Sequence, residues 1–169
     1  MSTPLPRDPI DDARRNWERH GWGDVAAPMA AITAIMRTQQ ILLARIEEVL
    51  KPHGLTFARY ELLALLSFAR GGALPMSRAS ALLQVHPTSV TNAVDRLEQA
   101  GLVERTPHPT DGRTTLVGLT GGGRALAERA TAALNTEVFA RSGFTDDDVD
   151  QLIRVLGAFR RRAGDFVDP

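Results

Sequence analysis

The chain of 169 residues contains no cysteine. Disulfide bonds, thiolate metal sites, a cysteine nucleophile and thiol-based redox sensing are therefore excluded. Aromatic residues make up only 5% of the chain, and no apolar run approaches the roughly 18–20 residues that a membrane-spanning helix needs. The first ten residues include three prolines and have no signal-peptide core, so we expect a loose N-terminal arm and a cytoplasmic protein.

The chain also has no excess of charge of either sign. Twenty basic and twenty acidic residues give a formal net charge of zero, so the bulk charge favours neither nucleic acid nor an anionic membrane. Hydrophobic residues make up 43% and charged residues 24%, which is ordinary for a globular chain. The length and composition predict about one domain that can bury a core.

The residue patterns of common enzyme sites are missing as well. The four histidines are widely spread, and the chain has no His-Glu-x-x-His pair, nucleophile elbow or phosphate-binding glycine loop. Gly121 to Gly123 precede a predicted helix and could bind an anion there, but we interpret them as a flexible exit from the hairpin described below. We therefore expect no enzymatic activity, no metal site and no cofactor.

Three helices are predicted in the first part of the chain. Asp11 to His20 has the pattern of a short polar helix, and Val25 to Leu50 has apolar residues at spacings of three and four, as in a long helix. Thr56 is expected to cap a third helix, Phe57 to Ala69, which is apolar on nearly all sides and is therefore expected to be central.

Two short helices joined by a tight turn are predicted next. Ser77 is a good N-cap for a helix that runs to about Gln84, Val85 and His86 form the turn, and Pro87 suits the first position of the following helix. Such a pair is a helix-turn-helix unit.

The second helix of this unit carries an unusual polar face. Its inward residues are Val90, Val94 and Leu97. Its outward residues are short hydrogen-bonding side chains and a single arginine, namely Thr88, Ser89, Thr91, Asn92, Asp95 and Arg96. Such groups can reach base edges and phosphates if the helix enters a major groove. A plain surface helix is the alternative interpretation of this segment taken alone.

A hairpin predicted directly afterwards favours DNA binding. Leu102 to Thr106 and Thr114 to Leu119 read as two strands joined by a loop with an Asp-Gly turn. A helix-turn-helix followed by a hairpin is a winged helix. Arg113, close to the tip, can enter a minor groove, and Asp111 is expected to hold the guanidinium by a charge-assisted hydrogen bond.

These segments resemble the MarR family of bacterial transcription regulators. Asp111 to Thr120, with Gly123 after it, is similar to the wing signature of that family, and Thr88 to Glu98, followed by Gly101 to Val103, is similar to its recognition helix and exit. The resemblance covers about Val25 to the end of the chain. It implies a homodimer with two winged-helix lobes that binds a pseudo-palindromic site on double-stranded DNA and responds to a small ligand.

The resemblance also implies residue roles. By position, Ser89, Thr91, Asn92 and Arg96 match recognition-helix contacts, with Thr88 at the start of that helix. Arg113 matches the minor-groove residue of the wing, supported by Asp111.

The C-terminal part fits a dimer. Thr120 to Ser142 is predicted to be helical, and Thr145 with the acidic run Asp146 to Asp148 predicts a capped helix start. The last helix has an apolar stripe consisting of Val149, Leu152, Ile153, Leu156, Phe159 and Ala163. A second subunit is the natural place to bury this stripe, and packing within one chain is the alternative.

A ligand cleft is implied between the dimerisation helices and the winged helix, where family members bind small aromatic or carboxylate molecules. Candidate lining residues are Trp17, His20, Trp22, Arg37, His53, Arg59, Tyr60 and Glu61, of which Trp17, His20, Arg59 and Glu61 are the predicted effector contacts. In a urate-binding branch of the family, Trp17 and Glu61 would match a tryptophan and an acidic residue, but Ala93 stands where an arginine is expected. Alternatively, Trp17 and Trp22 dock the arm against its neighbour, and His53 serves only at a helix C-terminus.

The predicted fold is mainly α with a small β-wing. It comprises an N-terminal arm and dimerisation helices (residues 1–54), a winged helix-turn-helix (55–120) and C-terminal dimerisation helices (121–169). The predicted function is that of a dimeric, ligand-responsive DNA-binding regulator, and a repressor is favoured over an activator.

The charge of the winged helix supports an alternative. From Ser77 to Arg113 there are four arginines and four acidic residues, whereas a DNA-binding surface is usually basic. We expect the acids to face inward or sideways, with few phosphate contacts and a modest salt dependence. The alternative function is a helical protein-interaction module that has lost DNA binding.

Overall fold

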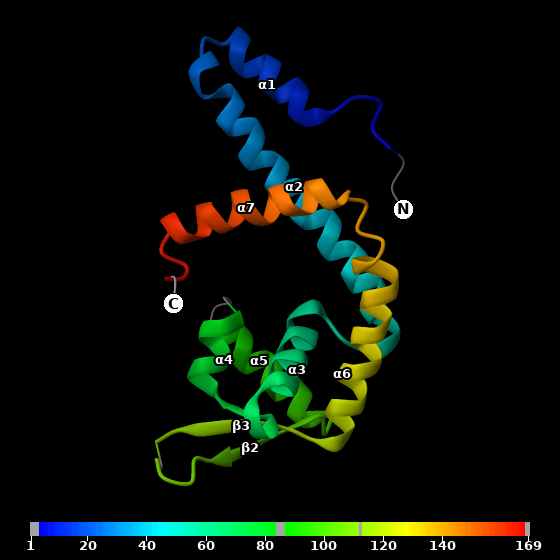
Figure 1. Ribbon diagram of the computed structural model, residues 1–169, viewed down its shortest axis with the longest axis vertical. Coiled ribbons are helices and arrows are strands. Elements are labelled where there is room, and N and C mark those ends of the chain that lie inside the picture. Colours follow the sequence, from blue (N-terminus) through cyan, green and yellow to red (C-terminus); the bar gives the residue numbers. More distant parts are fainter. Residues whose placement is uncertain (1–3, 84–86, 112, 168–169) are drawn as a thin grey trace.

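The computed structural model describes residues 4–83, 87–111 and 113–167, without the side chains of residues 87 and 88. The helices are α1 (Pro9–Arg19), α2 (Gly23–Leu50), α3 (Phe57–Phe68), α4 (Met76–Leu83), α5 (Pro87–Gln99), α6 (Gly121–Leu134) and α7 (Asp146–Arg162). Short 3₁₀ turns cover Lys51–His53 and Arg70–Gly72, and a π-helical turn covers Asn135–Phe139. The strands β1 (Ala73–Pro75), β2 (Val103–Pro107) and β3 (Thr115–Leu119) form an antiparallel sheet in the order β1-β3-β2. The predicted fold, mainly α with a small β-wing, is confirmed (Figure 1).

The core lies around α3, as its apolar sequence predicts. Leu62, Leu63 and Leu66 are fully buried on this helix, and Thr56 caps its start by accepting a hydrogen bond from the backbone N–H of Arg59. The other fully buried apolar side chains described in the lobe formed by α3, α4, α5 and the sheet are Ala79, Val90, Val94, Leu97 and Val117. One small core thus holds α5 and the β-wing in fixed positions.

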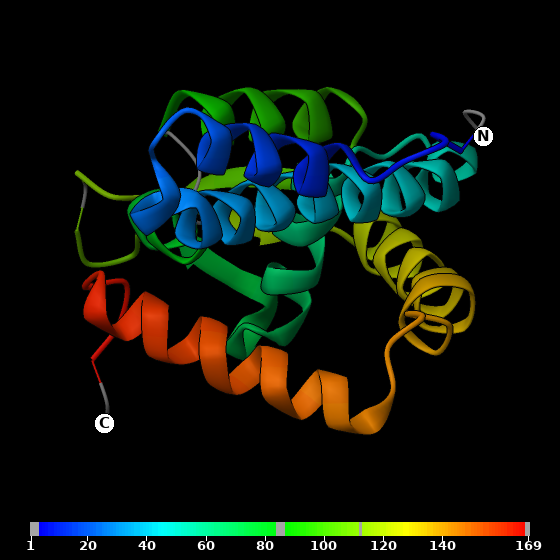
Figure 2. The same cartoon turned by 90° about the horizontal axis from the view of Figure 1, so that it is seen from above.

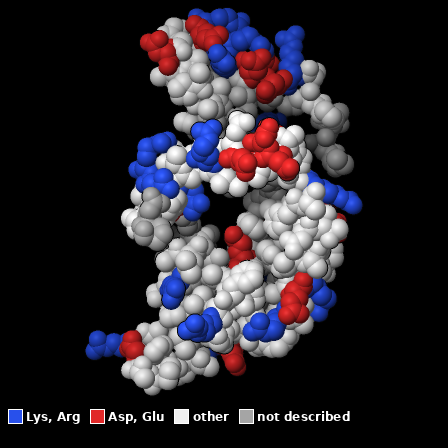
Figure 3. All heavy atoms as spheres, viewed as in Figure 1, with Lys and Arg blue, Asp and Glu red and all other residues white. Residues whose placement is uncertain are grey.

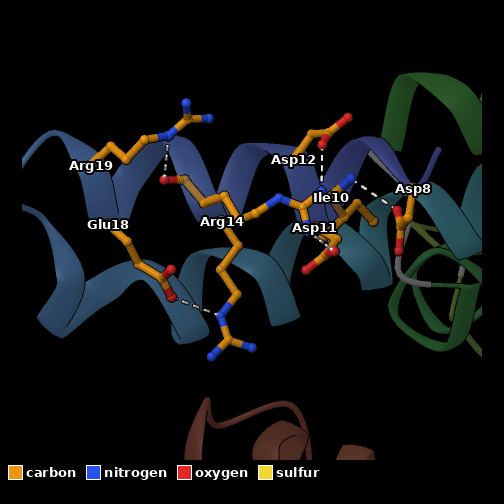
Figure 4. A network of polar contacts seen from close by, with 8 residues as sticks. Asp8, Ile10, Asp11, Asp12, Arg14, Glu18 and Arg19 are labelled. Carbon is orange, nitrogen blue, oxygen red and sulfur yellow. Dashed lines mark hydrogen bonds and ion pairs between the residues drawn. The ribbon is translucent and has the colours of Figure 1, made fainter.

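The N-terminal arm is shorter than predicted, because α1 already begins at Pro9. The Asp8 side chain accepts a hydrogen bond from the backbone N–H of Ile10 and caps the helix, and a proline is tolerated in the first turn. Arg15 forms ion pairs with both acids of that turn. Arg14 pairs with Glu18 at 3.2 Å (Figure 4). α1 packs back along α2 (Figures 1 and 2).

The first helix of the helix-turn-helix begins two residues earlier than predicted. Ser77 lies inside α4, which starts at Met76, so it is not the N-cap. The physical reason is that β1 pairs with β3 through Pro75, opposite Leu116, and the chain enters the helix directly from this strand. The predicted helix end at Gln84 and the predicted turn at Val85 and His86 lie outside the described residues.

The interpretation of Gly121 to Gly123 as a flexible exit is wrong, because they form the first turn of α6. Thr120 is the N-cap, and its hydroxyl oxygen accepts a hydrogen bond of 3.0 Å from the backbone N–H of Gly123. A Cβ atom at Gly123 would lie 2.0 Å from the carbonyl oxygen of Leu102, so only glycine fits here. The wing is therefore joined tightly to α6, whose helical course ends at Phe139 and not at Ser142.

α7 stands apart from the rest of the chain. Its predicted capping box is present, since Thr145 and Asp148 exchange side-chain and backbone hydrogen bonds. No residue of α7 is buried, and Figure 1 shows this helix apart from α3, α4 and α5. The apolar stripe predicted on this helix is therefore not covered by its own chain, with Ile153 67% and Phe159 62% exposed.

None of the helices in the described ranges is long and apolar enough to cross a lipid bilayer.

Candidate nucleic-acid interface

α5 separates buried apolar residues from exposed polar ones. The prediction that Val90, Val94 and Leu97 face inward is confirmed, since each is at most 1% exposed. The exposed residues of the opposite face are Ser89, Thr91, Asn92 and Arg96. The side chain of Thr88 lies outside the described residues. The exposed face thus offers two hydroxyls, an amide and a guanidinium within three turns of one helix, a set that can hydrogen-bond base edges and phosphates.

The wing presents Arg113 to solvent beyond the paired strands. Asp111 orders this loop, although not through the predicted contact with the Arg113 guanidinium. Its carboxylate accepts hydrogen bonds from the backbone N–H of Arg113 at 3.1 Å and from the hydroxyl of Thr114 at 2.8 Å. The Thr114 hydroxyl, followed by that N–H, holds the pKa of Asp111 below its usual value. These hydrogen bonds of Asp111 fix the backbone of the loop and do not hold the Arg113 side chain in one direction. The neighbouring Gly112 lies outside the described residues.

Arg105 of β2 is a structural residue that the sequence reasoning did not single out. Its guanidinium forms ion pairs with Asp95 and Glu98 of α5, and its backbone N–H donates to Glu98 at 3.1 Å. These contacts join the recognition helix to the wing. Neither helical nor strand periodicity signals such a contact, because it crosses between two elements.

The ion pairs of Arg105 show where two acidic residues of the neutral lobe lie. Two of the four acids, Asp95 and Glu98, are turned sideways toward β2, as expected, while Glu104 and Asp111 are exposed. Three of the four arginines are exposed, namely Arg78, Arg96 and Arg113. Zero net charge in the sequence therefore does not mean that each patch of the surface is neutral.

One chain does not bring the four predicted effector contacts together. Trp17 and His20 lie beside the α1–α2 turn, where Trp22 packs edge-on against Trp17 at 5.4 Å between ring centroids and stacks with His20 at 5.7 Å. Arg59 and Glu61 lie on α3, beyond the other end of α2. Since α2 has 28 residues, the two pairs are separated by a helix about 42 Å long. The observed ring contacts agree with docking of the N-terminal helix.

The two effector candidates on α3 also face different surroundings. Arg59 and Glu61 are two positions apart, which is roughly 200° around an α-helix. Arg59 lines a groove beside α5. Glu61 is half-buried, and this burial raises the pKa of its carboxyl group. They cannot line the same side of the helix.

Other candidate lining residues have structural surroundings of their own. Tyr60 is buried, and its hydroxyl lies 3.0 Å from that of Thr131 on α6. His53 lies in the 3₁₀ turn after α2 and lines a cavity of about 520 Å³ between α2 and α6. Arg37 is exposed on α2. Within residues 4–83, 87–111 and 113–167, no group of three or more His, Asp and Glu side chains could hold a metal ion.

The chain is similar to curated transcriptional regulators. A family model described as the MarR family matches residues 53–114. The transcriptional regulator PapX of Escherichia coli is 37% identical over 84 residues, which span 50% of this chain and 51% of PapX. The regulator PecS of Dickeya dadantii is 26% identical over 151 residues, or 88% of this chain and 90% of PecS. The chain thus spans about half of one curated relative and most of the other.

Solved structures give the same picture. Sco5413, a MarR family regulator from Streptomyces coelicolor, is 48% identical, with 84% of this chain and 99% of that chain covered and a TM-score of 0.77. A MarR mutant from Escherichia coli complexed with operator DNA is 26% identical, with 80% and 96% covered and a TM-score of 0.73. CouR from Rhodococcus jostii, bound to p-coumaroyl-CoA, is 29% identical, with 75% and 88% covered and a TM-score of 0.64.

Proposed function

Because this chain belongs to the MarR family of transcriptional regulators, we propose that it is a homodimeric repressor that binds a pseudo-palindromic operator and is released by a small aromatic or carboxylate effector. The observation that carries this proposal is the exposed polar face of α5 together with the exposed Arg113 of the wing. The MarR structure complexed with operator DNA, which shares this fold, supports it.

The homodimer is supported by the uncovered apolar surface. Besides the stripe on α7, the long helix α2 exposes Val25, Ile32, Ile35, Met36 and Ile41, each more than half exposed. In the space-filling view an opening passes through the molecule between α7 and the lobe that contains α3 (Figure 3). Exposed apolar surface of this extent marks an interaction site. In a twofold dimer each subunit would bury this surface against the same surface of the other.

The DNA contacts follow from the dimer. We propose that α5 of each subunit enters a major groove, with Ser89, Thr91, Asn92 and Arg96 at the bases and phosphates and Thr88 at the helix start. Arg113 enters the adjacent minor groove, where the narrow negative channel favours a guanidinium, and Asp111 supports it by ordering the wing backbone. Two lobes one helical turn apart bind together at a high effective concentration.

Two observations support the proposed effector. CouR, with a similar fold, has been solved bound to p-coumaroyl-CoA, and Glu61 is a half-buried carboxyl whose pKa is raised by burial. Trp17 and His20 stay predicted contacts that could meet Glu61 only from a second subunit.

Fluorescence anisotropy against DNA from the upstream region of the protein's own gene tests the proposal. At about 150 mM salt we expect at least about a hundredfold tighter binding than to a shuffled duplex, as for specific regulators. Because few phosphate contacts are expected in each lobe, the slope of log affinity against log salt should be smaller than about ten. If the operator lies elsewhere in the genome, selection from a random duplex library would identify it. A library without enrichment contradicts DNA binding, and a slope of ten or more contradicts this version of the interface.

Replacing Arg113 with Ala should remove most of the affinity for the operator duplex, about ten- to a hundredfold, because each subunit loses its minor-groove contact. Arg113→Lys keeps the charge but not the planar fork, so it should restore only part of the loss. The same anisotropy titration measures both. Unchanged binding by Arg113→Ala would favour the alternative, a protein-interaction module, over the regulator.

A further inference from the structure

A groove of about 350 Å³ with an arginine on each wall runs between the start of α3 and α5. It is lined by Thr56, Ala58 and Arg59 from the α3 side, and by Ser89, Asn92, Ala93 and Arg96 from α5. The small side chains Ala58 and Ala93 leave space between two arginines, one on each wall.

The groove has the chemistry of an oxyanion site. Among the described residues, neither Arg59 nor Arg96 forms an ion pair, and no carboxylate lines the groove. Arg59 is oriented by a hydrogen bond of 3.2 Å from its Nε to the hydroxyl oxygen of Thr56. The remaining guanidinium nitrogens can donate to one anion together with Ser89 and Asn92. Arg59 also lines the next hollow, where Glu47 and Lys51 of the α2 end offset each other in charge.

The position of the groove beside the recognition helix indicates that the anion is a phosphate of the DNA backbone. Ser89, Asn92 and Arg96 recur at spacings of three and four, so they form one stripe along the recognition helix. A helix that enters a major groove has a sugar-phosphate backbone on either side, and the element beside it faces that backbone. The start of α3 is such an element. Arg59 therefore adds a second guanidinium beside this stripe, on the side that faces the backbone and not the bases.

We propose that Arg59 and Arg96 hold one DNA backbone phosphate in this groove, with Thr56 orienting Arg59. This assignment rests on the proposed function, since it requires that α5 reads DNA. It replaces the predicted role of Arg59 in effector binding, and it leaves Glu61, on another side of α3, unaffected. A phosphate contact of this kind fixes the position of the lobe on the duplex and carries no sequence information.

The test is Arg59→Gln, measured by anisotropy over a salt series on two duplexes, the upstream DNA of the protein's own gene and its shuffled control. We expect the affinity for both to fall by the same factor, about tenfold, and the slope of log affinity against log salt to fall by about one for each bound subunit. Arg59→Lys should keep the salt slope. Arg129→Gln, which removes an exposed arginine of α6, should change neither quantity.

Three results would overturn the assignment. In the first, Arg59→Gln leaves both affinity and slope unchanged. In the second, the loss is confined to the upstream duplex, which would make Arg59 a base contact. In the third, DNA binding is retained but release by a small carboxylate is lost, which would return Arg59 to the effector site. Failure of the unaltered protein to bind any duplex would instead count against the proposed function.

Discussion

Replacing Leu152 with Glu is expected to turn the proposed dimer into a monomer at micromolar concentration. Leu152 lies on the apolar stripe of α7, a helix without a buried residue in its own chain. Losing the burial of one leucine costs about 2 kcal/mol, and placing a charge in an apolar contact adds to this cost. A twofold interface contains the change twice, so the dimer should weaken by about 4 kcal/mol, or roughly a thousandfold.

Sedimentation velocity over a range of concentrations measures this shift. Gln151→Glu is a matched control, because it introduces the same charge at the next residue, off the apolar stripe, and should stay dimeric. DNA affinity should fall together with dimerisation, since a single lobe loses the effective concentration of the second. A Leu152→Glu variant that stays dimeric would show that α7 is not the dimer contact.

Periodicity and capping explain why much of the fold could be predicted. The inward positions Val90, Val94 and Leu97 repeat as a helix face does, Thr56 caps a helix, and Thr145 with Asp148 forms a capping box. All of these signals are local. A short stretch of sequence contains both the cause and its structural effect.

The mistaken and missed features depend on contacts between distant segments. Arg105 pairs with Asp95 and Glu98 only because β2 turns back beside α5. The separation of Trp17 from Arg59 follows from the length of α2 and not from any local pattern. Periodicity places a residue on a face of its own element, but it does not say which other element meets that face.

The triple glycine shows this limit most sharply. Three consecutive glycines normally indicate flexibility, yet Thr120 ties this segment to the end of the recognition helix. Its hydroxyl donates to the carbonyl oxygens of Gly101 at 2.8 Å and Leu102 at 3.0 Å. The absent side chain at Gly123 lets α6 approach Leu102, so glycine serves close packing here.

Gly123→Ala should therefore destabilise the protein by about 3 kcal/mol, although alanine favours helices. The new methyl group would lie 2.0 Å from the carbonyl oxygen of Leu102 and 2.9 Å from Cδ1 of Leu119. One contact is with backbone already hydrogen-bonded to Thr120, so α6 must shift away from the wing. Since α6 leads from the DNA-binding lobe toward α7, the shift should also lower operator affinity.

Gly121→Ala provides the control within the same helical turn. Apart from its chain neighbours and the backbone of its own helix, no described atom lies within 4 Å of its added methyl group, and its φ angle is not positive. This variant should instead gain about 0.5–1 kcal/mol from the lower backbone entropy of the unfolded chain. Urea unfolding of both variants measures the two effects, which are opposite in sign. Equal stabilities would contradict close packing at Gly123, and opposite signs would show that Gly123 sets the distance between α6 and the wing.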